Sequence, residues 1–422
     1  PGFSLMLEPS LPIESIRAPL IDGLQTLNRF VLTAPAGAGK STQVPQMLLD
    51  GVSGLDGTIM VLQPRRLAAR MLAKRVAAER RQSLGEEIGF HVRFNQVTSH
   101  KTRILYVTEG LFWRRLISDP HLQGVSAILF DEFHERHIIG DLALARSLQV
   151  QQADRPDLYI GVMSATLDTS LVHEYLKPCS VHHCDGRSFP VSIEYSEDGS
   201  GLGSRPVWEK VARHIPRLLR ENVDGDVLVF MPGAYEIRRT VEALQFLRET
   251  KGMDILSLHG EMSPEQQDRV LENGIHRKVI VATNVAETSL TIEGVRLVID
   301  CGLARVSRYD SARGIDTLLT ERISQSSADQ RSGRAGRVGP GYCLRLWKAQ
   351  EQAHMIRHSE PEVYRIDLAP SILEMLASGI SSPVDFPWLE PPDSKAIVKA
   401  EKLLLDLGAV DPLGSLTPDG VR

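Results

Sequence analysis

Short apolar runs alternate with helical patterns over the first part of the chain. The runs between residues 30 and 166 are "FVLTAP", "TIMVLQP", "ILYVT", "SAILFDE" and "IGVMSAT", and each predicts a buried strand that ends in polar or small residues. Helical patterns such as "RLAARMLAKRVAAERR" lie between them. This alternation predicts βαβ units and therefore a parallel sheet with helices on both faces. Ligands of such sheets bind at the carboxyl ends of the strands, where polar residues of this chain gather.

A second series of strand patterns follows the Gly/Ser-rich stretch "SEDGSGLGSRP", which we interpret as the edge of a linker. Its runs are "DVLVFMPG", "DILSLHG", "KVIVATN" and "VRLVIDCG", again in an α/β pattern. From about Glu360 onward the chain becomes helical and rich in Leu and Ala. We therefore predict two α/β domains, residues 11–190 and 191–353, and a smaller module over residues 354–422. The last residues, "LTPDGVR", do not look like the end of a domain, so we expect the natural chain to continue.

The segment between residues 304 and 324 interrupts this second series. Its sequence "ARVSRYDSARGIDTLLTERIS" alternates polar and apolar residues on both sides of "DSARG", with Gly314 near the end of that loop. This pattern predicts a β-hairpin. Both an ordinary surface hairpin and a hairpin with a functional role fit the pattern.

Composition and charge narrow the class of protein. The chain has 422 residues, enough for two or three domains, and its 42% hydrophobic and 24% charged residues are ordinary for a soluble globular protein. A net charge of −5 and a pI near 6.3 exclude a uniformly basic coat for nucleic acid but leave room for a local basic groove. Only 5% of the residues are aromatic, so any nucleic-acid binding is expected to grip the backbone rather than stack on bases.

Other features favour a protein of the cytoplasm. The apolar runs are shorter than the roughly 20 residues that span a bilayer, and the sequence shows no signal-peptide pattern. The opening "PGFSL" lacks a start Met, and we interpret it as a remnant of cloning before Met6. Four cysteines do not make a disulfide framework, which favours a reducing compartment. The stretch "CSVHHC" contains zinc-ligand residue types, but without a second Cys pair nearby a structural loop is favoured.

A loop rich in Gly and Ala, "APAGAGKST", lies between the strand "FVLT" and a stretch compatible with a helix. Small residues let backbone N–H groups close around phosphate oxygens, while Lys40 can reach the β and γ phosphates and the Ser41 hydroxyl can ligate Mg²⁺. Ala34 replaces the first Gly of the usual pattern. Such a turn alone could simply connect two elements. The order of strand, loop and helix, together with an intact "GKS", favours phosphate binding. The predicted nucleotide-binding residues of the loop are Gly37, Ala38, Gly39, Lys40, Ser41 and Thr42.

The stretch "LFDEFHERH" places two acids directly after an apolar strand pattern. A Mg–nucleotide site needs one acid at a neighbouring strand end to hold the metal and a second acid to activate water. Asp131 and Glu132 suit these two roles, and His134 is placed to sense the nucleotide and to touch the facing domain. Solvated acids at a strand end are the alternative, which the phosphate loop makes less favourable.

The second α/β series ends in "QRSGRAGR". Arg334 and Arg337 are three residues apart, which predicts one helix face, and Gln330 precedes Arg334 by one turn. Two guanidinium groups facing a γ-phosphate would stabilise the charge of the transition state, and Gln330 would orient water. The alternative is a solvated basic helix. Gly333 and Gly336 argue against it, because an exposed helix gains nothing from two glycines.

Together these motifs resemble those of the DEAH (DEAH/RHA) class of superfamily 2 RNA helicases, nearest to its bacterial HrpB type. The matching blocks occur in the family's order over roughly residues 30 to 345 and are "APAGAGKST", "LQPRRLAAR", "LGEEIGFHVRF", "VTEGLFWRRL", "DEFHERH", "SAT", "DVLVFMPG", "LHGEMSPEQQ", "ATNVAETSLTI" and "QRSGRAGR". Their joint occurrence is highly specific. The resemblance implies two tandem RecA-like domains followed by a winged-helix-like module, in which the hairpin lies against the RNA path.

The resemblance also assigns roles to single residues. It implies that Ser164 and Thr166 couple hydrolysis to domain movement and that Thr288 and Ser289 sense the γ-phosphate. Arg75 matches the residue of the first domain that clamps the nucleotide base. The positions implied to contact RNA are Arg65, Arg66, Thr108, Glu109, Gly110, Thr283 and Asn284.

The basic stretch "PRRLAARMLAKRVAAERR" carries seven Lys or Arg in eighteen residues, enough for an edge that faces phosphates. For Arg70, Lys74, Arg80 and Arg81, however, we favour a solvated helix face. The chain departs from the family at Phe133, which replaces the Ala of DEAH as in the HrpB type. Leu271 lies where an aromatic clamp would be expected, and no adenine-reading Gln motif precedes the phosphate loop, so we expect other NTPs to be accepted beside ATP.

We therefore expect an ATP-dependent RNA helicase that uses Mg²⁺, moves along single-stranded RNA and unwinds tailed duplexes. An RNA-stimulated ATPase that remodels ribonucleoprotein without processive unwinding is the main alternative, and strand separation distinguishes the two. A nucleotide-gated scaffold without turnover is a third class, which Lys40, Glu132 and Arg337 argue against. The preference for RNA over DNA rests on the resemblance alone. We expect a monomer without membrane contact and leave an activating protein partner open.

Overall fold

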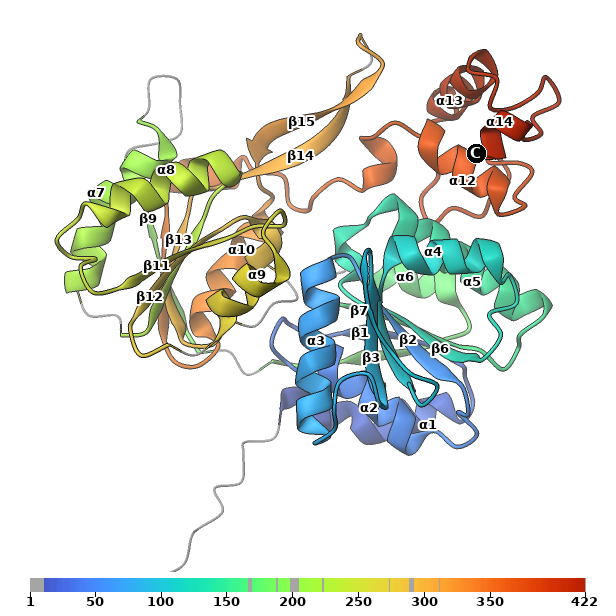
Figure 1. Cartoon of the computed structure of the whole chain (residues 1–422), viewed down its shortest axis with the longest axis horizontal. Coiled ribbons are helices and arrows are strands. Elements are labelled where there is room, and N and C mark those ends of the chain that lie inside the picture. Colours follow the sequence, from blue (N-terminus) through green and yellow to red (C-terminus); the bar gives the residue numbers. More distant parts are fainter. Residues whose placement is uncertain are drawn as a thin grey trace, which may run out of the picture. The chain divides into compact units, whose positions relative to one another are not determined.

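The computed structural model describes residues 11–165, 169–186, 189–197, 205–221, 224–272, 274–287, 292–310 and 312–421. The chain divides into two compact units (Figure 1): unit 1 consists of Pro1–Gly186 and Pro361–Arg422, and unit 2 is Arg187–Glu360. The C-terminal residues thus share a unit with the first α/β domain. Their assignment to a separate third module stays a prediction.

Unit 1 is built on an eight-stranded sheet in the order β4-β3-β5-β2-β6-β7-β1-β8. Every pairing is parallel except that of β4 with β3. The strands are β1 (Arg29–Thr33), β2 (Thr58–Gln63), β3 (Ile88–Val92), β4 (Asn95–Val97), β5 (Ile104–Thr108), β6 (Val125–Phe130), β7 (Tyr159–Ser164) and β8 (Ser180–His183). The five strands predicted from apolar runs are confirmed. Strand β8 covers most of "CSVHHC", so the structural loop predicted there is wrong.

Helices cover both faces of this sheet, as the βαβ pattern predicts. Alternate strand residues point to opposite faces: Val31 and Met60 belong to one buried cluster, Leu32 and Ile59 to another. The second cluster is completed by α1 (Arg17–Leu24), α2 (Lys40–Gly51) and α3 (Arg66–Glu79), preceded by the 3-10 turn η1 (Pro12–Ile16). The first is completed by α4 (Glu109–Ser118), α5 (Ile138–Ala153) and α6 (Thr169–Leu176).

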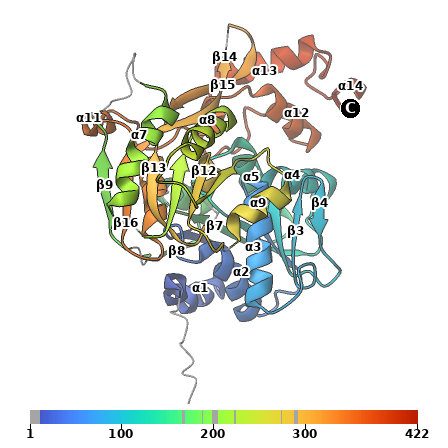
Figure 2. The ribbon, with the colours of Figure 1, turned by 60° about the vertical axis from the view of Figure 1, so that its left-hand side comes forward.

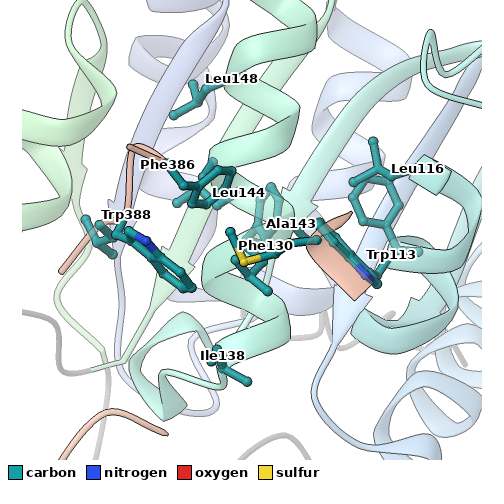
Figure 3. Close-up of a cluster of buried hydrophobic side chains, with 14 of the residues drawn as sticks. Trp113, Leu116, Phe130, Ile138, Ala143, Leu144, Leu148, Phe386 and Trp388 are labelled. Carbon is teal, nitrogen blue, oxygen red and sulfur yellow. The ribbon is translucent and has the colours of Figure 1, made fainter. Parts of the chain in front are cut away.

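The C-terminal residues pack on the α5 side of this sheet. Their elements are η5 (Glu362–Tyr364), α12 (Ala369–Ala377), α13 (Ser394–Asp406) and α14 (Pro418–Val421), with an isolated bridge between Val410 and Leu416. Phe386 and Trp388 form an edge-to-face pair with ring centroids 5.2 Å apart. Both rings belong to the same buried cluster as Leu144 of α5 (Figure 3). Residues far apart in the sequence therefore share one hydrophobic core, while the winged-helix nature of the module stays a prediction.

A buried ion cluster strengthens this packing. The Arg136 guanidinium lies 2.8 Å from Asp141 Oδ2 and 2.5 Å from Glu390 Oε2, and its side chain is only 9% exposed. The backbone N–H of Glu362 donates to the Arg136 carbonyl at 3.0 Å. Burial raises the pKa of Asp141, although the hydrogen bonds and charge of Arg136 oppose that rise. Arg136 thus compensates a buried carboxylate and joins α5 to the C-terminal residues.

Arg136→Ala is expected to destabilise unit 1 by about 3–5 kcal/mol, because it leaves the buried Asp141 carboxylate without its partner. The free energy of unfolding, measured in urea, tests this. Arg17→Ala is the control, because Arg17 and Glu14 form an exposed pair that should contribute less than about 1 kcal/mol. Equal stability of the two variants would contradict the anchoring role of Arg136.

Unit 2 contains a six-stranded parallel sheet in the order β11-β12-β10-β13-β16-β9. The strands are β9 (Val191–Tyr195), β10 (Asp226–Phe230), β11 (Asp254–Leu258), β12 (Lys278–Ala282), β13 (Val295–Asp300) and β16 (Gly341–Arg345). The helices are α7 (Val207–Arg220), α8 (Ala234–Gln245), α9 (Pro264–Leu271), η3 (Asn284–Ala286), α10 (Gln325–Gly333), η4 (Arg334–Gly336) and α11 (Ala349–Ala353). Strand β9 lies beside β16 at one edge (Figure 2), so the chain joins this sheet before the predicted Gly/Ser-rich linker.

The predicted hairpin is confirmed. Strands β14 (Leu303–Asp310) and β15 (Ile315–Arg322) pair antiparallel, with Gly314 at a φ of 71° in the connection. Three apolar side chains of β15 are strongly exposed: Ile315, Leu318 and Leu319. Within the hairpin Arg308 pairs with Glu321, and its guanidinium lies 2.9 Å from Glu360 Oε2. Among the described residues, no helix combines the length and the apolar character needed to cross a membrane.

Candidate nucleotide and RNA sites

The predicted phosphate loop connects β1 to α2. Gly37 and Gly39 have φ values of 90° and 99°, in the left-handed region that favours glycine. A Cβ on Gly39 would lie 3.0 Å from Ile13 Cγ2, so this position also has little room for a side chain. The Ala34 N–H donates to the Ser164 carbonyl at 3.0 Å, and the Ile13 N–H donates to the Ala38 carbonyl at 3.1 Å. The loop is therefore held from both sides, and Ser164, predicted to couple hydrolysis to movement, contacts it through its backbone.

Lys40 and Glu132 face each other at the carboxyl ends of β1 and β6. Lys40 Nζ lies 3.2 Å from Glu132 Oε1, and both side chains are buried. Lys40 begins α2, and Glu132 has a φ of 51°, in the left-handed region. Strained backbone of this kind is concentrated at functional sites. The two residues expected to bind phosphate and to activate water are thus brought together.

Asp131 lies beside this pair and is buried. Gln63 Nε2 donates to Asp131 Oδ2 at 2.6 Å, and the Ser41 hydroxyl is also hydrogen-bonded to this carboxylate. Burial raises the pKa of Asp131, the charge of Glu132 adds to the rise, and Lys40 opposes it. Two buried carboxylates therefore face one lysine, a charge pattern that suits an added cation, and the predicted Mg²⁺ ligands Ser41 and Asp131 are already in contact.

Gln63 is a functional candidate that the sequence reasoning missed. It ends strand β2, directly before Pro64 and next to the end of β6 in the sheet. Its position at the carboxyl edge of the sheet was a usable signal, because that edge holds the ligands in such folds. Within the described residues, no group of three His, Cys, Asp or Glu could hold a metal ion by itself.

His134 lies between Glu132 and the "SAT" segment. Its Nδ1 is 3.6 Å from Glu132 Oε2 and accepts a hydrogen bond from the Ala165 N–H at 3.5 Å. This places His134 against the predicted catalytic base. Its contact with a facing domain stays a prediction. Three predicted residues lie outside the described residues: Thr166, Thr288 and Ser289.

The residues of unit 1 predicted to contact RNA lie at the ends of adjacent strands. Thr108 ends β5 opposite Gln63 of β2, and Arg66 and Gly110 just beyond these ends are exposed. Arg65 Nη2 lies 2.8 Å from Glu135 Oε2, and Glu109 Oε2 lies 3.1 Å from His137 Nδ1. The structure therefore gathers these residues at one edge of the sheet, while their contact with RNA stays a prediction.

Helix α3 corrects one expectation about the basic stretch. Arg70 is buried, so the solvated face predicted for it is wrong; it lies next to the apolar positions that pack α3 on the sheet. Arg80 is not freely solvated either, because its guanidinium pairs with both Asp50 and Glu87. Lys74 and Arg81 are exposed as expected. Arg75, predicted to clamp the base, is 58% exposed and pairs with Glu79 at 2.7 Å.

The "QRSGRAGR" segment of unit 2 spans two helical elements. Gln330 lies in α10, Arg334 begins the 3-10 turn η4, and Arg337 follows it. Side chains three residues apart eclipse in 3-10 geometry, so the common face of Arg334 and Arg337 stays a prediction. Gly336 explains the tight approach here, since a Cβ on it would lie 2.6 Å from the Phe189 carbonyl, whereas Gly333 faces open space.

Glu287 organises this segment and was also missed. Its carboxylate accepts from Arg331 Nε at 2.8 Å, and its carbonyl accepts from Arg334 Nε at 2.8 Å. Arg331 is fully buried and also pairs with Asp300 at 2.9 Å. Arg334 is buried as well, whereas Arg337 and Gln330 are half-buried. Of the predicted pair of arginines, Arg337 is therefore the more exposed.

The remaining predicted RNA contacts of unit 2 follow β12. The Thr283 N–H donates to the Leu258 carbonyl at 3.1 Å, and the Thr283 side chain caps the 3-10 turn η3. Asn284 begins η3, and both residues are half-buried. They lie three and four residues before Glu287, which binds the arginine segment. The predicted RNA positions and the partner of the arginines therefore both follow the end of β12.

Comparisons with known proteins agree with this geometry. The model of the helicase conserved C-terminal domain matches residues 210–339. The ATP-dependent RNA helicase HrpB of Escherichia coli (strain K12) is 40% identical over 408 residues, which are 95% of this chain and 49% of that protein. The crystal structure of the Escherichia coli DEAH/RHA helicase HrpB matches with a TM-score of 0.90 at 39% identity, over 98% of this chain and 52% of that one. The chain is similar to DEAH/RHA helicases over nearly its whole length.

These matches confirm the resemblance to DEAH/RHA helicases and the α/β class with two parallel sheets. A probable ATP-dependent RNA helicase of Saccharomyces cerevisiae, DHR2, is 35% identical over 427 residues, which are 99% of this chain and 58% of that protein. The chain spans about half the length of HrpB, so the DEAH/RHA relatives extend well beyond the matched region.

Proposed function

We propose that this protein is an ATP-dependent RNA helicase. The observation that carries the proposal is the buried constellation of Lys40, Asp131 and Glu132 behind a glycine-bearing loop. A lysine and two carboxylates are costly to bury, and buried charge clusters of this kind are concentrated at functional sites. The names of two relatives support the same reading: HrpB is called an ATP-dependent RNA helicase, and DHR2 a probable one.

In this proposal the residues of unit 1 bind the nucleotide and activate the attacking water. The backbone N–H groups of residues 37–42 surround the phosphates, and Lys40 moves from Glu132 to the β and γ phosphates. Glu132, released from Lys40, accepts a proton from the attacking water, and His134 lies beside its carboxylate. Asp131 and Ser41 would hold Mg²⁺, which when bound neutralises charge on the phosphates. Since no adenine-reading motif precedes the loop, other NTPs are proposed as substrates beside ATP.

Unit 2 supplies the remaining groups in the proposal. Arg337 stabilises the charge that develops on the γ-phosphate, Gln330 orients water, and Arg334 keeps the segment attached to Glu287. Thr288 and Ser289 are proposed to sense the γ-phosphate, and Thr166 to act with Ser164 in coupling. Arg65, Arg66, Thr108, Glu109, Gly110, Thr283 and Asn284 are the proposed contacts to single-stranded RNA. A cytoplasmic location and a monomeric state belong to the same proposal, with DNA binding left as an outcome of the test.

An ATPase assay with RNA, with single-stranded DNA and without polymer tests the proposal. Phosphate release should be stimulated most by RNA, and RNA binding should weaken steeply with salt because backbone contacts dominate. A tailed duplex then separates the alternatives, since a remodelling ATPase without processive unwinding hydrolyses ATP but leaves the strands paired. Absence of phosphate release in all three conditions would contradict the proposal and favour a nucleotide-gated scaffold.

Removing the hairpin between Val306 and Leu318 and replacing it by a short Gly-containing turn should leave RNA-free hydrolysis nearly intact. Unwinding of a tailed duplex should fall by about tenfold or more, which corresponds to about 1.4 kcal/mol in the barrier. The reason is that a hairpin proposed to lie along the RNA path acts on the strand and not on the nucleotide. Unwinding and ATPase rates measured on the same preparation check this.

A gentler variant controls for damage to unit 2, because the deletion also removes Arg308 and its pair with Glu360. Changing the exposed Ile315, Leu318 and Leu319 to Ser keeps the hairpin backbone and should also lower unwinding. Ile275→Ser is the matched control, since Ile275 is an exposed apolar residue of the same unit outside the hairpin. Equal losses in hydrolysis and unwinding, or none in either, would show that the hairpin is an ordinary surface connection.

A further inference from the structure

The turn that carries Glu132 faces two sets of residues. Glu132 and Arg136 both have left-handed backbone, with φ values of 51° and 48°, and the 3-10 turn η2 (Phe133–Glu135) lies between them. The side chains of Glu132 and His134 lie in the nucleotide site. Those of Glu135 and His137 instead meet residues at the ends of neighbouring strands.

His137 joins three of these strand ends. Its Nδ1 lies 3.1 Å from Glu109 Oε2, just after β5, and its Nε2 lies 3.6 Å from Glu135 Oε2, just after β6. Glu135 Oε2 in turn lies 2.8 Å from Arg65 Nη2, just after β2. Strands β5, β2 and β6 are neighbours in the sheet. The series Glu109, His137, Glu135 and Arg65 therefore runs along its carboxyl edge.

The surroundings of the His137 ring favour its positively charged form. Both ring nitrogens face a carboxylate, and only the imidazolium carries an N–H on each nitrogen. The charged groups around the ring are Glu109, Glu135 and Glu362, with Arg65 beyond Glu135. Burial opposes the charge, but the three carboxylates, Glu109 first, outweigh burial and raise the pKa of His137 to about 9.

We propose that His137 is a positioning residue that couples RNA binding to ATP hydrolysis, by linking the turn of Glu132 to Arg65 and Glu109. This inference rests on the proposed function, in which Arg65 and Glu109 contact RNA. An RNA phosphate that attracts the Arg65 guanidinium competes with Glu135 for it, because both are anions that suit its planar fork. Glu135 is then left to His137, and the turn that begins at Glu132 shifts with it.

Gly140 offers a way to disturb this link without removing a charge. It lies in the first turn of α5, and a Cβ built on it would meet Glu109 Oε1 at 2.8 Å. Gly140→Ala is therefore expected to displace the Glu109 carboxylate from His137. Neither Gly140 nor His137 belongs to the proposed catalytic or RNA-contacting residues.

RNA-free and RNA-stimulated ATPase rates of the 422-residue chain test the proposal. His137→Gln should keep the RNA-free rate within about twofold and lower the stimulation by RNA about 5- to 10-fold, the lower range of coupling between two sites. Gly140→Ala should lower it in the same direction. His137→Arg, which keeps the charge and two donors, should retain most of the stimulation. The control is His121→Gln, because His121 forms an exposed pair with Asp154 and should behave as wild type.

The pH profile separates positioning from a merely structural role. When folding raises the pKa of a group, the contribution of its protonated form is fully present below the ordinary pKa. That contribution is lost as pH rises through the raised value. Wild-type stimulation should therefore fall as pH passes about 9, whereas His137→Arg should not show that loss.

Two results would overturn the inference. One is wild-type stimulation in both His137→Gln and Gly140→Ala. The other is an equal loss of RNA-free and RNA-stimulated rates in variants that melt at the wild-type temperature. If His137→Gln melts early, the comparison of Gly140→Ala with His137→Arg decides. A wild-type chain that hydrolyses ATP without any response to RNA would contradict the proposed function instead.

Discussion

Glu132→Gln should bind ATP at least as tightly as the wild type and lose turnover by about 10²- to 10⁴-fold, the usual contribution of a general base. The geometry explains why the two effects separate. The Glu132 carboxylate lies 3.2 Å from Lys40 Nζ, so it would compete with phosphate for that lysine. Gln has the same shape but no charge, so it frees Lys40 and cannot accept the proton from water. ATP affinity by equilibrium titration and single-turnover hydrolysis measure the two quantities.

Lys40→Ala is the matched comparison, because it changes the other member of the same buried pair. It should lose both ATP affinity and turnover, since the buried carboxylates of Asp131 and Glu132 would then repel phosphate without compensation. Equal ATP affinity in wild type and Lys40→Ala would show that residues 34–42 do not form the phosphate site. Turnover of Glu132→Gln close to that of the wild type would remove Glu132 from its catalytic role.

Arg337→Ala should slow hydrolysis by about 10³-fold or more, as expected when an arginine that stabilises the transition state is lost. ATP affinity should change little, because the guanidinium is needed mainly for charge that develops during the reaction. Arg337→Lys should recover only part of the rate, since an ammonium lacks the planar fork of donors. Steady-state rates with saturating RNA, together with ATP titration, check these expectations.

Arg334 provides an internal contrast. Its buried guanidinium donates to the Glu287 carbonyl, so Arg334→Ala should lower the melting temperature as well as the rate. Its effect on the melting temperature should exceed that of Arg337→Ala, because Arg337 is only half-buried. Arg239→Ala is the surface control, because Arg239 forms an exposed pair with Glu242 in the same unit. A loss of less than about tenfold in Arg337→Ala would contradict its assignment as the arginine of the transition state.

Local sequence patterns were sufficient to predict the alternating strands and helices of the fold. Apolar runs and their polar ends predicted the strands β1, β2, β5, β6 and β7, and with them the proximity of Lys40, Asp131 and Glu132. That proximity follows from the parallel sheet, whose carboxyl ends share one edge. The hairpin was predictable for a similar reason, because alternation and Gly314 are both local signals.

Contacts between distant segments were not predictable from such patterns. Arg136 and Glu390 are 254 residues apart. The hydrophobic periodicity of neither segment indicates that the two residues are in contact. Gln63 and Glu287 were missed because their importance lies in what they hold, Asp131 in one case and two arginines in the other. The burial of Arg70 likewise depends on tertiary packing, which overrides the expectation that a basic residue on a helix is solvated.

The position of residues 361–422 has a consequence for how the protein folds during its synthesis on the ribosome. Phe386 and Trp388 complete the core that covers α5, yet they are synthesised only after all of unit 2. At about 5–20 residues per second, roughly 10 to 50 s separate the synthesis of α5 from that of α13. During that interval the nascent first domain presents an uncovered apolar helix face. Unit 2 is by then fully emerged, so the later half of the chain can reach its native state before the earlier half does.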